Sequence, residues 1–126
     1  MTRRVFKLID RASWQAAARP GSFDGSAVDV RDGFIHFSTA AQVHETAARY
    51  FAGQPDLLLV AVAAESLGDA LKWEPSRGGA LFPHLYAPLP LGAVLWVADL
   101  PLDASRHHVF PELLADPADS DQPTDP

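Results

Sequence analysis

The chain has 126 residues, of which 48% are apolar and 21% charged, with no cysteine and a net charge of −6. These values are typical of one soluble globular domain, and they exclude disulfides and thiol chemistry. The sequence shows no basic patch, which argues against binding to duplex nucleic acid. Since it also has no apolar run of the roughly 18 residues that a membrane helix needs, and no signal-peptide hydrophobic region, we expect a cytoplasmic protein without a membrane partner.

The first third of the chain predicts a strand, a helix and a loop. A short apolar run at 5–9 predicts a strand, and the following residues 11–18 predict a helix that is capped by Asp10 or Ser13. Residues 20–33 are rich in Gly, Ser and Asp, a composition typical of a loop.

A strand and a capped helix come next. Residues 34–37 predict a second strand, and Thr39 and Gln42 have the spacing of a capping box that opens a helix over 40–52. Four apolar residues recur at helical spacing and are expected to form the buried face of this helix. They are Val43, Ala47, Tyr50 and Phe51.

The second half of the chain predicts mainly strands. Residues 56–64 do not alternate and predict a central strand that is buried on both faces, whereas 71–74 alternate between apolar and charged residues. Three prolines in 82–92 argue against a regular helix or a central strand there. A last buried strand is expected at 93–100. Helices early and strands late indicate an α+β fold.

The C-terminal end differs in composition from the rest. Residues 114–126 contain four aspartates and no basic residue, and such a segment has too little apolar surface to offset its ordering entropy. We therefore predict a single domain over 1–113 and an acidic disordered tail over 114–126.

Two of the five histidines lie where they could meet a ligand. His36 shares a strand face with Phe34 and precedes a helix N-terminus, where Ser38 and Thr39 add hydroxyl groups. His84 would share a face with Tyr86 in an extended backbone, and the two could bind a planar heterocycle. The spacing alone leaves a structural role open for either histidine. No spacing typical of a metal site is present, so we expect no bound metal.

Three further polar residues are candidates for the same site. Glu74 lies on the polar face of an alternating strand and could accept from a sugar hydroxyl or act as a base. Arg77 lies in an Arg-Gly-Gly loop, and its planar guanidinium could donate two hydrogen bonds to a phosphate or carboxylate. Lys7, in the first strand, is either a solvated edge residue or a ligand contact.

Several segments together resemble a bacterial family known as domain of unknown function 952. The resemblance runs from about Val5 to Leu100 and is carried by the segments GSAVDVRDGFIHFST, ETAARYFAG, LKWEPSRGG and FPHLYAPL. The family is similar to the ADP-ribosyltransferase fold, a split core of two small β-sheets with a nucleotide cleft between them. The resemblance therefore implies an ADP-ribosyltransferase-like α+β fold with two helices in the N-terminal half.

The comparison with the RNA 2′-phosphotransferases implies roles for particular residues. Ile35-His36-Phe37-Ser38 matches the strand that lines the cleft in those enzymes, so His36 would bind a ribose hydroxyl or a pyrophosphate. Lys7 stands where the superfamily usually has His or Arg. His84 or Tyr86, or alternatively Glu74, would take the place of the superfamily's catalytic Glu.

The same resemblance implies the ligand. NAD would be the substrate, with Tyr86 stacked on nicotinamide, Arg77 or Lys7 at a phosphate, and Trp73 as an apolar wall. We thus expect a cleft for NAD or another nucleotide, with ADP-ribosyl transfer or a related phosphotransfer as the reaction. Two alternatives stay open: a binding module without catalysis on the same fold, and an acid–base enzyme that uses its histidines on a small molecule.

Overall fold

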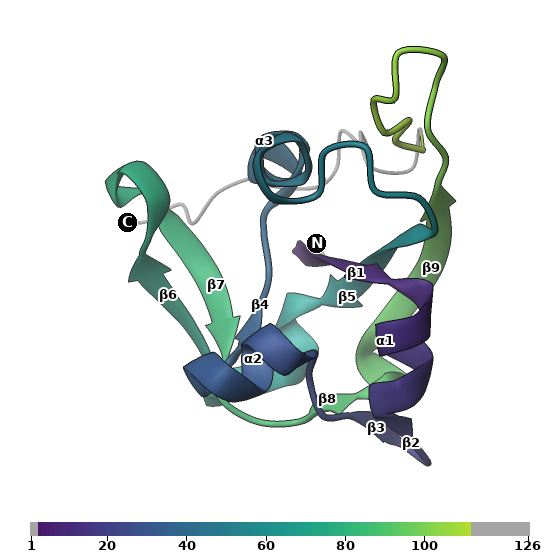
Figure 1. The fold of residues 1–126 in the computed structure, drawn as a ribbon. Coiled ribbons are helices and arrows are strands. Elements are labelled where there is room, and N and C mark those ends of the chain that lie inside the picture. The colour runs from purple at the N-terminus through teal and green to yellow at the C-terminus, as the bar shows by residue number, and fades with distance from the viewer. Residues whose placement is uncertain (1–2, 112–126) are drawn as a thin grey trace.

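A three-stranded antiparallel sheet forms the centre of the fold, which the computed structural model describes for residues 3–111 (Figure 1). Its strands are β1 (Arg4–Asp10), β5 (Leu57–Ala63) and β9 (Val94–Leu100), with β5 in the middle. Every residue of β5 is buried, which confirms the prediction of a central strand. The strand reads as an unbroken apolar run because apolar side chains cover both faces of the sheet.

The two faces of this sheet carry two separate apolar clusters. Helix α3 (Ala40–Tyr50) covers one face through Val43 and Ala47, which pack with Phe6 and Leu59. The other face packs against side chains from the remaining sheets and from α1. This larger cluster includes Val5, Ile9, Val60, Val62, Ile35, Phe37 and Leu85.

Two predictions about apolar residues in these layers are wrong. The last strand, β9, is not buried throughout, since Leu95 and Val97 are 46% and 43% exposed. Both β1 and β9 are edge strands of this sheet, but α1 and α3 pack on β1, which is buried almost throughout. Tyr50 is 63% exposed because it belongs to the last turn of α3, beyond the face that packs on the sheet.

A second antiparallel sheet carries four of the predicted site residues, His36, Trp73, Glu74 and His84. It contains β4 (Ile35–His36), β7 (Leu81–Leu85) and β6 (Leu71–Pro75), with β7 in the middle. One of its faces contributes to the larger apolar cluster, while the other presents polar and aromatic side chains.

A third small sheet joins β2 (Ala18–Arg19), β3 (Ser22–Phe23) and β8 (Leu89–Pro90). The described part of the chain therefore has three small sheets in place of the two that were expected. The fold is mixed α+β, as predicted.

Strand β7 contradicts the prediction that its prolines exclude a central strand. Pro83 lies inside β7, and its carbonyl accepts a hydrogen bond from the Phe37 N–H at 3.0 Å. The N–H and C=O of one residue point to the same side of an antiparallel strand. The missing N–H of Pro83 therefore faces Phe37, the residue after the end of β4. The proline therefore loses one hydrogen bond at the end of this ladder, beyond which Ser38 pairs with Phe6 of β1.

The helices also differ from the prediction in one place. Besides α1 (Arg11–Ala17) and α3, a short helix α2 (Ala27–Asp32) lies within the segment expected to be a loop. Ser26 and Asp29 form a capping box at its start, and Gly33 ends it with a φ of 88°. The first half of the described chain thus has three α-helices and not two.

Three 3-10 segments complete the described structure: η1 (Ala64–Ala70), η2 (Arg77–Gly79) and η3 (Leu91–Ala93). Among residues 3–111, no helix is long and apolar enough to span a bilayer. The predicted acidic tail, 114–126, lies outside the described residues.

Candidate functional site

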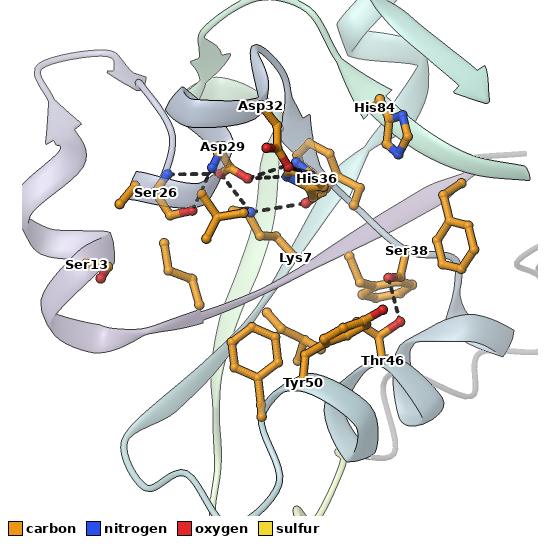
Figure 2. Close-up of a pocket in the computed structure, with 18 of the residues that line it drawn as sticks. Lys7, Ser13, Ser26, Asp29, Asp32, His36, Ser38, Thr46, Tyr50 and His84 are labelled. Atoms are coloured by element: carbon orange, nitrogen blue, oxygen red, sulfur yellow. Dashed lines mark hydrogen bonds and ion pairs between the residues drawn. The ribbon is translucent and has the colours of Figure 1, made fainter. Parts of the chain in front are cut away.

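A pocket of about 670 Å³ lies against the polar face of the β4–β7–β6 sheet. Its lining comes from β1, from α2 and its N-cap, from the segment that links β4 to α3, and from the C-terminal end of α3. Figure 2 shows that the polar side chains Lys7, Asp29, Asp32 and His36 gather at one side of this pocket, and Tyr50 and Thr46 of α3 lie at the other.

A buried ion pair forms one part of the lining. Lys7 Nζ lies 2.9 Å from Asp29 Oδ2, and both side chains are almost fully buried. The ammonium also donates to the His36 carbonyl at 3.1 Å. Lys7 therefore does line the pocket, but its charge is engaged by Asp29.

The His36 ring is held between two carboxylates of α2. Its Nδ1 lies 2.6 Å from Asp29 Oδ1, and its Nε2 lies 3.0 Å from Asp32 Oδ2. Both contacts can be hydrogen bonds at the same time only if both ring nitrogens carry a proton. The His36 side chain keeps 36% of its surface exposed, so it is fixed in place and still accessible.

Asp29 is the centre of this cluster. In addition to the two side-chain contacts, it accepts hydrogen bonds from the backbone N–H groups of Ser26 and His36, at 2.9 and 3.1 Å. Burial by itself would raise the pKa of Asp29, but the hydrogen bond from His36 and the charge of Lys7 outweigh this effect and hold the pKa well below its usual value. In the opposite sense, burial lowers the pKa of Lys7, and Asp29 counteracts part of this change.

His84 reaches the same pocket because of the strand register. His36 of β4 and His84 of β7 are directly opposite each other, and cross-strand neighbours have their side chains on one face. The centroids of the two rings are 5.8 Å apart. The Phe34 ring stacks on His84 at 4.1 Å and also contacts His36 at 4.5 Å.

A second carboxylate–imidazole pair lies on this sheet. Glu74 Oε1 is 2.7 Å from His84 Nδ1 and accepts from the Tyr86 hydroxyl at 2.8 Å. The hydrogen bonds from His84 and Tyr86 lower the pKa of Glu74, and the same contact with Glu74 raises the pKa of Tyr86. Glu74 thus holds the rings of both residues.

The predicted site residues fall into two groups. His36, His84, Lys7 and Ser38 line the pocket, whereas Thr39, Trp73, Glu74 and Tyr86 do not. Thr39 is buried in the capping box of α3, and Trp73 packs against the larger apolar cluster. Tyr86 lines a separate, shallower hollow of about 320 Å³ beside Phe34. The Arg77 side chain lies outside the described part of the structure.

Asp29 and Asp32 were missed by the sequence reasoning. The capping-box spacing of Ser26 and Asp29 was the available signal for α2. On a helix, residues three apart lie on one face, so this signal would also have placed the two aspartates together. Among residues 3–111, no three His, Asp or Glu side chains are grouped in a way that could hold a metal ion.

The sequence was compared with protein families and with curated proteins. Residues 8–97 match a family described as a protein of unknown function, DUF952. This match confirms the family resemblance that the motifs indicated. No curated protein matches the chain at a significant level.

Solved structures of one bacterial protein are similar to this chain. The crystal structure of CC0527 from Caulobacter crescentus superposes with a TM-score of 0.82 at 54% identity, covering 89% of this chain and 98% of that protein. The solution NMR structure of CC0527 has a TM-score of 0.72 at 56% identity, with 82% and 90% covered.

Proposed function

The chain belongs to the DUF952 family of proteins of unknown function, and we propose that its pocket binds a ribosyl-containing ligand of the NAD or nucleotide class. The observation that carries the proposal is the accessible His36 ring, which Asp29 and Asp32 fix at the pocket wall. Both ring nitrogens are engaged by the carboxylates, so the hydrogen-bond acceptors for neighbouring sugar hydroxyls are the remaining lone pairs of Asp32, whose side chain is 32% exposed beside the ring.

The size and walls of the pocket support a ligand of this class. Its volume of about 670 Å³ lies within the roughly 300–1,000 Å³ that is usual for small-molecule sites. The aromatic side chains of Tyr50, Phe51 and Phe82 line it and offer surfaces against which a planar base can pack.

The charges of the lining favour the sugar and the base over the phosphates as the main anchors. The lining contains Lys7 and Arg31 against Asp10, Asp29 and Asp32. Lys7 is paired with Asp29, and Arg31 with Asp32, so neither cation is positioned as a dedicated phosphate contact. We therefore expect a nucleoside to bind about as well as the corresponding pyrophosphate compound.

The reaction that we propose is ADP-ribosyl transfer or a related phosphotransfer, on an ADP-ribosyltransferase-like fold. It is supported by the likeness of Ile35-His36-Phe37-Ser38 to the cleft strand of the RNA 2′-phosphotransferases. The alternative is a binding module that keeps the pocket and lacks the chemistry. The enzyme and the binding module would both bind the ligand, but only the enzyme would convert it to product.

Calorimetry tests the binding proposal. NAD, ADP-ribose, nicotinamide riboside and adenosine are titrated into the wild type, His36→Ala and His107→Ala. His107 is a matched control because its exposed side chain lies outside the pocket. His36→Ala removes the ring that holds Asp32 at the pocket wall. Loss of a ligand hydrogen bond to that charged group costs about 1.5–3 kcal/mol, so binding should weaken roughly 10- to 100-fold. The proposal fails if none of the four compounds binds at millimolar concentration, or if both variants bind like the wild type.

A further inference from the structure

We propose that His84 is the general base of the pocket, and that it takes a proton from a water or hydroxyl nucleophile that attacks the anomeric carbon of a ribosyl ligand. This inference rests on the proposed function for its substrate class. It assigns to the site a reaction type, nucleophilic displacement of an N-linked leaving group by an oxygen nucleophile.

The burial and contacts of His84 are the first support. His84 lines the pocket and is only 6% exposed. Its Nδ1 forms a hydrogen bond with Glu74 Oε1 at 2.7 Å. Its other ring nitrogen, Nε2, has no hydrogen-bond partner among the backbone groups and side chains that the structure describes, which do not include the side chains of Arg19 and Arg77. Buried polar atoms are usually satisfied, so an open nitrogen at a pocket wall is suited to a ligand or a water.

Glu74 determines which nitrogen of His84 carries the proton. The carboxylate accepts from both His84 and Tyr86, and these two hydrogen bonds lower the pKa of Glu74. An ionised carboxylate only accepts hydrogen bonds, so His84 must hold its proton on Nδ1. In the neutral ring, Nε2 then carries the lone pair that a base needs.

The two histidines of the pocket are thus set up for different tasks. Both nitrogens of His36 contact carboxylates, so its ring positions Asp32 for the ligand and is not free to act as a base. His84 has a single carboxylate contact, and the stacked Phe34 ring at 4.1 Å limits its rotation. With the two rings 5.8 Å apart, a ligand held at His36 would have its reacting carbon close to His84.

The step balances with NAD as the ligand. The bond between the anomeric carbon and the nicotinamide nitrogen breaks, and its electron pair returns to the pyridine ring, which leaves uncharged. A bond forms between the nucleophile oxygen and the anomeric carbon. The proton of the nucleophile moves to His84 Nε2 and is later released to water. General-base catalysis of this type contributes roughly 10²–10⁴-fold.

The test measures which nitrogen of His84 carries the proton, and how fast nicotinamide is released from NAD. Long-range ¹⁵N–¹H spectra of the imidazole rings report which nitrogen of His84 is protonated, and nicotinamide release from NAD is followed in wild type, His84→Gln, Glu74→Gln and the control His107→Ala. We expect the Nδ1–H form in the wild type, and release at least about 100-fold slower in His84→Gln.

Glu74→Gln tests whether Glu74 acts by positioning the His84 ring and not by binding NAD. It also keeps the proposal testable if His84→Gln does not fold. Glu74 is 39% exposed and outside the pocket lining, so the fold and the NAD affinity should be kept. An amide can accept through its oxygen or donate through its nitrogen, so the His84 spectrum should show both tautomers while release slows.

Each outcome decides between the proposals. If NAD binds to the wild type but His84 is protonated on Nε2, or if His84→Gln releases nicotinamide at the wild-type rate, the base is another group. If NAD binds and the wild type releases no nicotinamide, the general-base inference is overturned and ribosyl binding stands. If no ribosyl ligand binds at all, the proposed function falls and the reaction step falls with it.

Discussion

At the scale of single residues, Asp29 links the stability of the protein to the organisation of its pocket. It is 3% exposed and contacts Lys7 Nζ, His36 Nδ1 and two backbone N–H groups. A buried lysine without a counter-charge is strongly destabilising, since the desolvation of the ammonium is no longer compensated. The carboxylate that orients His36 is therefore also the group that makes a charged Lys7 tolerable in the core.

Asp29→Asn should destabilise the protein at neutral pH by about 3–5 kcal/mol, the usual cost of removing one partner of a buried ion pair. The contribution of Asp29 should also depend on pH. Its pKa in the folded state is depressed, so the stabilisation is complete above the unfolded value of about 3.9 and is lost as the pH falls below it. Urea unfolding at pH 7, 5, 4 and 3 measures both effects.

The control for this measurement is Asp69→Asn, at an exposed aspartate in η1. It should leave the stability and its decline below about pH 4 close to those of the wild type. If Asp29→Asn loses as much stability between pH 5 and pH 3 as the wild type does, the acid sensitivity comes from other groups.

At the scale of elements, α2 depends on its ends more than on its sequence. It has only six residues, too few for a helix to be stable by propensity. The Ser26–Asp29 capping box satisfies its first N–H groups, and Gly33 ends it in the left-handed region. Asp29 serves in both the cap and the pocket, so the formation of this helix and the assembly of the site are coupled.

Gly33→Ala should therefore cost about 1 kcal/mol through backbone strain alone. Its φ is 88°, and an added Cβ would meet no atom within 4 Å. The matched control is Gly92→Ala, at a glycine that also has nothing within 4 Å of an added Cβ but no positive φ. Chemical denaturation of both variants gives the difference between their free energies of unfolding. Equal stabilities would mean that α2 tolerates another C-terminal conformation.

At the scale of the whole molecule, β5 joins the two apolar clusters. Leu59 faces the cluster under α3, and the next residue, Val60, faces the larger cluster on the opposite side of the sheet. Loss of packing in either layer should loosen the strand that both layers share. We therefore expect one cooperative unfolding transition.

Leu59→Ala should lower the free energy of unfolding by about 2–5 kcal/mol, because it leaves a cavity in the core. Trp14 and Trp73 pack against the larger cluster and Trp96 against the other, so fluorescence reports on both layers. The fluorescence and circular dichroism transitions should coincide in this variant. Two separate transitions would show that the layers unfold independently.

Leu95→Ala is the control for this experiment. Leu95 is 46% exposed on the edge strand β9, and its truncation should change the stability by no more than about 0.5–1 kcal/mol. A cost similar to that of Leu59→Ala would indicate that the outer side of β9 is covered in solution.

The sequence predicted those parts of the fold that depend on local patterns. The unbroken apolar run of β5 and the capping box of α3 are signals that burial and helix ends impose on a few adjacent residues. Strand β7 was missed because the tolerance of Pro83 depends on where its partner strand ends, which is set by contacts distant in the chain. The capping-box spacing could have placed Asp29 on a helix, but its pairing with Lys7, 22 positions away, depends on contacts distant in the chain.

The register between β4 and β7 has a consequence for how this protein can change in evolution. His36 and His84 face each other through backbone pairing, and a shift of one residue would turn every side chain of a strand to the opposite face. An insertion or deletion inside either strand would thus turn the imidazole of that strand away from the other one and break the pair. The hairpin at 76–80 between β6 and β7 can vary in length without this penalty, so diversification among relatives should concentrate there.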